Sequence, residues 1–145
     1  MKTYVDSGVL IKLYVREPNS PEAIRVISTI PSIQIAPIHE LEIRNAFRAL
    51  EGRKTLSSRQ RAACEHMFDR DIGLNRLRRV TPDWSEVFQK ANRLSQEHTA
   101  GTLARSLDIL HVAIAVVEQA ETLVTGDSRQ EQLARLAGLQ VQLIE

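Results

Sequence analysis

The sequence predicts an α/β fold in which a mainly parallel sheet is covered by helices on both faces, a three-layer α/β/α arrangement. Short apolar segments that suit strands alternate with segments whose apolar residues recur at helical spacing, which is typical of parallel strands joined by helical crossovers. The 145 residues are 43% hydrophobic and 26% charged, an ordinary globular composition. No repeat or linker interrupts the chain, so residues 1–145 are expected to form a single domain.

Several short segments between the predicted helices, and one after the last helix, are expected to be extended. They are residues 1–5, residues 33–36, a short piece at Val80, residues 122–125 and residues 139–144. Between them the apolar spacing and the positions of Gly and Pro predict helices. These cover residues 7–15, 21–28, 38–51, 57–75, 82–98, 106–118 and 128–137.

Individual residues mark the ends of these helices. Gly52 and Gly138 follow predicted helices and suit a left-handed turn. Ser57 and Gln60 form a capping box at the start of a basic helix. The segment ILHVAIAVV, within residues 106–118, is so apolar that its helix is expected to be largely buried.

Composition excludes some classes of protein. No apolar run approaches 20 residues, so no membrane span is expected, and the start MKTYVDSGVL does not resemble a secretory signal. Cys64 is the one cysteine, which excludes an internal disulfide and is consistent with a cytoplasmic protein. A small buried side chain is a better interpretation of Cys64 than a catalytic thiol.

The net charge of +1 hides an uneven distribution. Residues 44–79 hold ten Lys and Arg against four Asp and Glu, and the rest of the chain holds nine against fourteen. A basic middle beside an acidic remainder suits a polyanionic substrate held near a metal-binding pocket. Solvated helix faces explain the same arginines without any substrate.

Two aspartates follow predicted strands, where ligands collect in parallel sheets. Asp6 comes directly after the first strand, and Asp127 comes two residues after the strand 122–125. Each could instead be a helix N-cap. For Asp127 that alternative is weakened because Ser128 and Glu131 form a capping box without it.

Two further acids lie on helices at apolar positions. At 100° per residue Glu42 shares a face with apolar side chains, whereas Glu40 points towards arginines. A buried Glu42 needs a cation or a salt bridge, for example to Arg105. Asp108 opens the most apolar helix, where it could favour the helix dipole or bind a ligand.

Together the four acids suggest a metal site, because converging carboxylates repel unless divalent cations neutralise them. Oxygen ligands suit Mg²⁺ or Mn²⁺. Such ions activate water for attack on a phosphodiester. Spacing alone does not show that the four acids converge.

At this point the chain resembles the PIN-domain family, specifically the VapC-like toxin ribonucleases. The segment YVDSGVLIKLYVREP resembles the family's first motif and supplies Asp6, and IAPIHELEIRNAFRAL resembles the second and supplies Glu42. RSLDILHVAIA resembles the third motif with Asp108, and LVTGDSRQEQLARLAGL resembles the fourth with Asp127 and the neighbouring hydroxyl of Thr125. The match is in family order and runs from end to end.

The resemblance implies a single PIN domain and a magnesium- or manganese-dependent endoribonuclease, the toxin of a type II toxin–antitoxin system. A metal-bound water would attack the RNA phosphodiester, with Asp6, Glu42 and Asp108 as primary metal ligands and Asp127 as the most peripheral one. It also implies a homodimer and a cognate antitoxin that covers the site. Arg105 and Arg129 are candidates for binding RNA phosphates, and ion pairs with the nearby acids are the alternative.

One position departs from the family pattern. Gly8 stands where the family has Ser or Asn two residues after the first Asp, and Ser7 could substitute for that side chain. Gly8 is also the best support for an alternative reading, a catalytically inactive PIN-like module that binds RNA or protein. A haloacid-dehalogenase phosphatase would need an aspartate at Gly8, and no P-loop or G-x-G-x-x-G motif is present. The four histidines lack metal-ligand spacing, and His111 is best read as a core residue.

Overall fold

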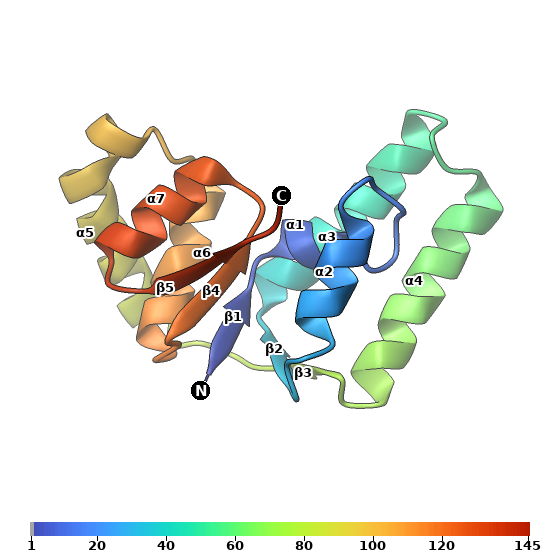
Figure 1. Ribbon diagram of the computed structural model, residues 1–145, viewed down its shortest axis with the longest axis horizontal. Helices are drawn as coiled ribbons and strands as arrows, with labels where there is room; N and C mark the ends of the chain where they lie inside the picture. Colours follow the sequence, from blue (N-terminus) through green and yellow to red (C-terminus); the bar gives the residue numbers. More distant parts are fainter. Residues whose placement is uncertain (1) are drawn as a thin grey trace. The chain divides into compact units, whose positions relative to one another are not determined.

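All strand pairs of the described chain are parallel, in agreement with the alternation of strands and helices in the sequence. The structure, a computed structural model, describes residues 2–145. Its strands are β1 (Thr3–Val5), β2 (Ile33–Ile35), β3 (Leu77–Arg79), β4 (Thr122–Thr125) and β5 (Gln140–Leu143). Its helices are α1 (Ser7–Ile11), α2 (Ser20–Ile27), α3 (Pro37–Gly52), α4 (Ser58–Gly73), α5 (Trp84–Thr102), α6 (Ser106–Val117) and α7 (Ser128–Leu136) (Figure 1).

The chain folds into two compact units. One unit comprises residues 1–6 and 82–145 and contains the sheet β1–β4–β5; it is called the β1–β4–β5 unit below. The other comprises residues 7–81 and contains the pair β2–β3; it is called the β2–β3 unit. Each sheet is parallel, because every connection between paired strands is a crossover that includes a helix.

In the β1–β4–β5 unit, strand β4 is central and brings the ends of two sequence-distant strands together. Val5 is in register with Val124, and Thr125 is in register with Leu143. Helices α5, α6 and α7 pack against one another, and α7 contacts β4 and β5. Figure 1 shows these three helices grouped around the strands. The apolar segment 112–115 of α6 is buried, as its sequence predicts.

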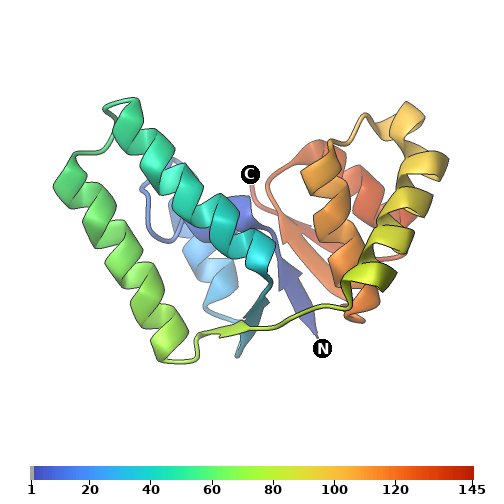
Figure 2. The same cartoon turned by 180° about the vertical axis from the view of Figure 1, so that it is seen from behind.

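In the β2–β3 unit, the core joins α3 and α4 through aromatic side chains. Phe47 of α3 and Phe68 of α4 are fully buried. Each makes an edge-to-face contact with Tyr14, at centroid distances of 6.0 and 5.7 Å, a preferred geometry for aromatic pairs. Figure 2 shows α3 and α4 as two long neighbouring helices.

Several predicted helix ends are confirmed. The hydroxyl of Ser57 accepts from the main-chain N–H of Gln60, whose side chain accepts in turn from the N–H of Ser57. Gly138 follows α7 with a φ of 95°, a left-handed conformation that glycine adopts without strain.

Other helix boundaries differ from the prediction. Helix α3 continues through Gly52, and the left-handed residue is Lys54. The helix predicted over 7–15 is regular only in α1, because the next residues form i→i+3 turns such as Tyr14 N–H to Ile11 C=O. Helix α5 extends beyond residue 98 and ends where Leu103 adopts a φ of 55°. No helix within residues 2–145 is long and apolar enough to cross a membrane.

Candidate metal centre

Asp6 directly follows β1, at the edge of the sheet where ligands collect in parallel α/β folds. Its main-chain N–H donates to the carbonyl of Val124 at 2.9 Å, which continues the β1–β4 ladder by one bond. The side chain of Asp6 is 14% exposed. The nearly buried carboxylate of Asp6 therefore lies where strand β1 ends, at the C-terminal edge of the sheet.

A buried pair of side chains lies beside Asp6. The Tyr4 hydroxyl lies 2.6 Å from Nδ1 of His111, and Nε2 of the same ring lies 3.8 Å from Oδ1 of Asp6. Asp6 continues the extended course of β1 two residues after Tyr4, so both side chains lie on the same face and approach different nitrogens of one imidazole. His111 is 1% exposed. It is a core residue, as the sequence suggested, and it is also a neighbour of the candidate site.

Gln130 approaches Asp6 from α7. Its side-chain amide Nε2 lies 3.4 Å from Oδ1 of Asp6, and the residue is fully buried. The sequence analysis did not find Gln130. Its signal was a polar residue in an apolar stripe, because Gln130 precedes Leu133 and Ala134 at helical spacing and those two are also buried.

Asp127 is the N-cap of α7. Its Oδ1 accepts from the main-chain N–H groups of Arg129 and Gln130 at 2.8 and 3.0 Å. The predicted capping box of Ser128 and Glu131 is wrong, since Ser128 is already the first helical residue. Capping uses one oxygen of a carboxylate that has about four lone-pair positions, so the cap does not prevent Asp127 from binding a further ligand.

Thr125 supports Asp127 through the backbone. The Thr125 hydroxyl accepts from the main-chain N–H of Asp127 at 3.1 Å. Thr125 is fully buried at the end of β4. Its hydroxyl therefore fixes the turn that carries Asp127 out of the sheet.

Asp108 lies in the first turn of α6 with its side chain 18% exposed. Oδ2 of Asp108 is buried and accepts no hydrogen bond from the described residues. The nearest cation is Nε of Arg105, at 3.6 Å from Oδ2, on a side chain that is 76% exposed. This buried oxygen, with only an ion pair at 3.6 Å, retains the capacity to accept a stronger ligand.

Glu42 belongs to the other compact unit and is distinguished from Glu40 by its partner. Oε1 of Glu42 accepts from the hydroxyl of Ser7 at 3.0 Å. Glu40 instead accepts two hydrogen bonds from Arg79, and these hold the pKa of Glu40 below its ordinary value. The expected proximity of Glu40 to arginines is confirmed, whereas both acids are partly exposed, so burial does not distinguish them. Ser7, the predicted supporting residue, is buried.

The four acids suit a divalent cation because of their carboxylate oxygens, not because these oxygens already surround an ion site. Within residues 2–145 no group of three or more His, Cys, Asp or Glu side chains is arranged to hold an ion. The atom in favour of a cation is Oδ2 of Asp108, because a buried acceptor without a donor is destabilising. An oxygen-only donor set is the one that Mg²⁺ and Mn²⁺ prefer.

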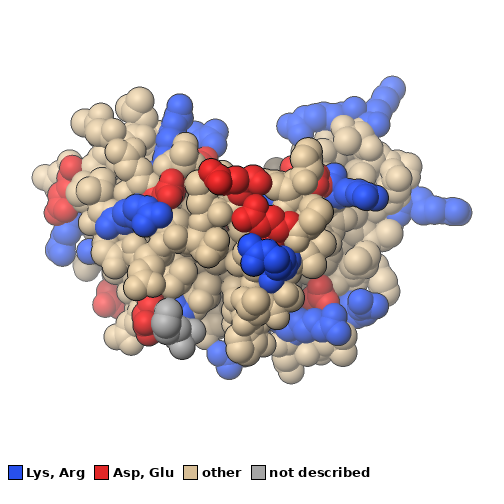
Figure 3. All heavy atoms as spheres, in the orientation of Figure 1, with Lys and Arg blue, Asp and Glu red and all other residues tan. Residues whose placement is uncertain are grey.

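The basic residues between 44 and 79 lie on the β2–β3 unit, and Figure 3 shows Lys and Arg side chains projecting on the side of α3 and α4. Five of the ten pair with nearby acids: Arg44, Arg48, Arg61, Arg76 and Arg79. The other five are exposed and form no ion pair within the described chain: Arg53, Lys54, Arg59, Arg70 and Arg78. Half of these basic side chains therefore have an acidic partner nearby, and the other half do not. Arg129, at the start of α7, is also exposed.

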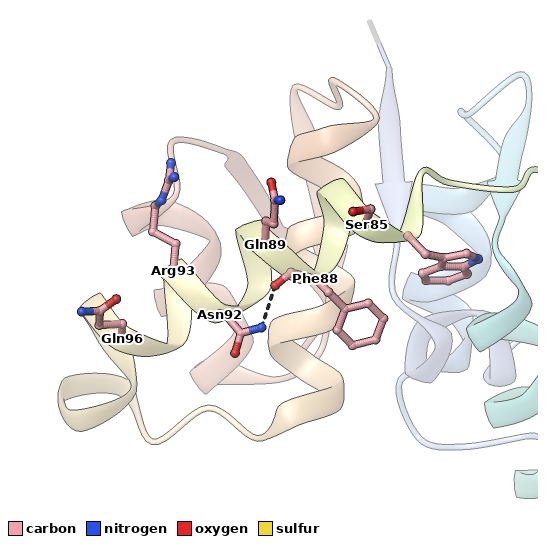
Figure 4. A pocket seen from close by; sticks show the side chains of 7 residues that line it. Ser85, Phe88, Gln89, Asn92, Arg93 and Gln96 are labelled. Atoms are coloured by element: carbon pink, nitrogen blue, oxygen red, sulfur yellow. Dashed lines mark hydrogen bonds between the residues drawn. The ribbon is translucent and has the colours of Figure 1, made fainter.

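A separate open pocket of about 730 Å³ lies along α5 (Figure 4). Trp84 and Phe88 have ring centroids 6.3 Å apart, and Phe88 is 52% exposed. The remaining lining residues are polar: Ser85, Gln89, Asn92, Arg93 and Gln96. No carboxylate lines this pocket, so it is distinct from the acids of the candidate metal centre.

The fold is similar to that of several solved structures. One is VapBC2 from Rickettsia felis bound to a DNA fragment from their promoter, with a TM-score of 0.70 and 18% identity over 100% of both chains. Another is FitAcB from Neisseria gonorrhoeae, with a TM-score of 0.69 and 14% identity over 96% of this chain and 95% of that one. A third is a toxin–antitoxin complex from Klebsiella pneumoniae, with a TM-score of 0.61 and 16% identity over 100% of this chain and 98% of that one.

These similarities define an α/β protein with the architecture found in toxin–antitoxin structures. A family model of the PIN domain matches residues 3–136, and the chain belongs to the PIN-domain family. Comparison with curated protein sequences gives no significant match. The predicted fold class and the resemblance to this family are confirmed.

Proposed function

We propose that this PIN-domain chain is a magnesium- or manganese-dependent endoribonuclease whose metal ligands are Asp6, Glu42, Asp108 and Asp127. The observation that carries the proposal is the environment of Asp6. His111 on α6 and Gln130 on α7 both face its carboxylate. His111 lies three residues after Asp108, and Gln130 lies three residues after Asp127. Helices α6 and α7, which carry Asp108 and Asp127 at their N-terminal ends, thus each place one side chain near Asp6.

Glu42 enters the proposal on different grounds. Its segment resembles the second motif of the family, and its partner Ser7 is the residue that follows Asp6 in the chain. Carboxylates that converge need a divalent cation between them, since two charges 4 Å apart repel by about 4 kcal/mol at an effective dielectric of 20. A cation removes that repulsion.

Different residues of the chain would bind the cation, support the site and bind the RNA. When bound, the cation would activate a water molecule and stabilise charge on the scissile phosphate. Asp6, Glu42 and Asp108 would hold the cation, while Asp127, fixed by Thr125 and by the start of α7, would be the peripheral acid. Arg105 and Arg129, both exposed, would bind RNA phosphates.

The same proposal includes the biological setting. We infer that the chain is the toxin of a type II toxin–antitoxin system, that it forms a homodimer, and that a cognate antitoxin covers the acids. The support is the similarity of its fold to structures described as VapBC2 and as a toxin–antitoxin complex, together with the family match across residues 3–136, which we take as evidence for one PIN domain.

The proposal is tested by incubating purified protein with RNA in Mg²⁺, Mn²⁺ or EDTA. Cleavage in either metal and none in EDTA is expected. Asp6→Asn should lower the rate by more than about 100-fold, because loss of a direct ligand costs more than loss of an outer-shell partner. RNA binding without metal-dependent cleavage would instead favour an inactive binding module, the reading that Gly8 supports.

A further inference from the structure

Gln130 has an unfavourable position for a residue with a purely structural role. It is fully buried, and its carbonyl oxygen Oε1 accepts no hydrogen bond from the described residues. Within residues 2–145, two buried side-chain atoms lack a hydrogen-bond partner, and these are Oε1 of Gln130 and Oδ2 of Asp108. A buried acceptor without a donor destabilises the fold, and an apolar side chain of similar length would remove that cost.

The other half of the Gln130 amide explains why a polar residue stands there. Its Nε2 faces Oδ1 of Asp6 at 3.4 Å. An ionised carboxylate accepts hydrogen bonds and donates none, so the NH₂ side of the amide is the side that must face Asp6. The main-chain N–H of Gln130 donates at the same time to Oδ1 of Asp127. One residue therefore contacts two of the acids, one through its side chain and one through its backbone.

His111 approaches the same oxygen of Asp6 from α6, with Nε2 at 3.8 Å from Oδ1. Its other ring nitrogen, Nδ1, forms a buried hydrogen bond of 2.6 Å with the Tyr4 hydroxyl. Tyr4 thus fixes the orientation in which the ring turns Nε2 towards Asp6. In metal sites such partners orient the ligand and determine its affinity for the ion.

We propose that Gln130 is a positioning residue of the metal centre, holding the Asp6 carboxylate from α7 while His111 holds it from α6. The inference depends on the proposed function, since it assigns a role towards the cation that Asp6 would bind. The role of Gln130 is additional to those of the four acids, because Gln130 itself would contact neither RNA nor the cation. Gln130 should then lower the stability of the metal-free protein while it raises the affinity for the cation. A residue with a purely structural role would not show this combination.

The test is Gln130→Met, which keeps length and removes the amide, measured by Mn²⁺ titration calorimetry without RNA and by thermal unfolding in EDTA. The matched control is Gln132→Met on the exposed side of α7. We expect Gln130→Met to weaken Mn²⁺ binding about tenfold with an unchanged or higher unfolding temperature, and Gln132→Met to leave Mn²⁺ binding unchanged. His111→Gln, which keeps a polar side chain near Asp6, should bind Mn²⁺ more tightly than His111→Leu.

The outcomes are distinguishable. If the unaltered chain binds Mn²⁺ and Gln130→Met binds it equally well, the role of Gln130 is overturned and the proposed function stands. If Gln130→Met loses Mn²⁺ affinity and unfolding temperature together, the residue is structural and the inference is also overturned. If the unaltered chain binds no Mn²⁺ and cleaves no RNA, both proposals fail.

Discussion

The hydroxyl of Tyr4 lies 2.6 Å from Nδ1 of His111 and joins β1 to α6 inside the β1–β4–β5 unit. Both residues are buried. The contact spans more than one hundred positions of the sequence, yet it is local in space because β1 pairs with β4, the strand that follows α6. It places the imidazole between a tyrosine and Asp6, and so connects the core of the unit to the candidate metal centre.

Tyr4→Phe should lower the free energy of unfolding by about 1–2 kcal/mol, because it breaks a buried hydrogen bond and leaves Nδ1 of His111 without that partner. Urea unfolding in EDTA measures this loss without any contribution from a bound cation. In the double variant Tyr4→Phe with His111→Leu, the loss should be no greater than for His111→Leu alone, since the bond is already broken. Fully additive losses would show that the two side chains do not depend on each other.

Glu40 and Glu42 form a natural pair of matched variants because they lie on one helix and differ in their partners. Glu42→Gln should abolish metal-dependent RNA cleavage, whereas Glu40→Gln should leave it within about twofold of the unaltered rate, a change of less than 0.5 kcal/mol by the usual conversion. Equal losses in both variants would contradict the assignment of Glu42 as the site glutamate. Initial cleavage rates in saturating Mn²⁺ separate the two outcomes.

Glu40 also predicts a dependence of stability on pH. Hydrogen bonds from Arg79 hold its pKa below the ordinary value, so its contribution is present above about pH 4.5 and is lost as the pH falls. Arg79 is 62% exposed, so the contribution should not exceed about 1 kcal/mol. Glu40→Gln should therefore be less stable than the unaltered chain at pH 7, and the gap should narrow towards pH 3 in urea titrations.

Local signals predicted the fold well because they act within a few residues. The capping box of Ser57 and Gln60 and the glycine at 138 each determine the conformation of adjacent backbone, and the structure confirms them. The apolar segment 112–115 predicted a buried helix for the same reason. Where two local signals competed, as at Asp127 and Ser128, the sequence did not reveal which residue would cap the helix.

Contacts between distant segments were beyond the sequence. The sequence places Gln130 on a helix but does not show that its side chain contacts Asp6, which follows the distant strand β1. His111 was correctly expected in the core, but its second neighbour, Asp6, depends on the pairing of β1 with β4. Helix ends that no capping residue marks were also predicted wrongly. Helix α5 continues beyond the predicted end at residue 98, until Leu103 adopts a left-handed conformation.

Two substitutions at Asp127 separate its roles as helix cap and as metal-site acid. Asn is also a good N-cap, so Asp127→Asn should keep the free energy of unfolding within about 0.5 kcal/mol, whereas Asp127→Ala should lose about 1 kcal/mol. Both remove the negative charge and should weaken Mn²⁺ binding to a similar extent. If Asp127→Asn binds Mn²⁺ as tightly as the unaltered chain, Asp127 acts as a cap and not as a member of the metal centre.

Tyr14 predicts how the β2–β3 unit responds to alkali. Burial, and then the hydrogen bond to Asp71 at 2.6 Å, raise the pKa of Tyr14 above its ordinary value near 10. The native state therefore retains the proton to higher pH than the unfolded chain does. The stability that this difference provides is present below pH 10 and is lost as the pH rises above it, by at most about 1.4 kcal/mol for each pH unit.

Tyr14→Phe isolates this effect, because Tyr4 is present in both proteins and its titration cancels in the comparison. At pH 7 the variant should be less stable by about 1 kcal/mol, since Asp71 loses a donor while keeping Arg76 at 3.4 Å. Phe cannot ionise, so its free energy of unfolding should fall less between pH 10 and pH 11, and the gap between the two proteins should close. Guanidinium unfolding at pH 7, 10 and 11 measures the gap directly, and a gap that stayed constant or widened in alkali would mean that Tyr14 ionises as readily in the folded protein as in the unfolded chain.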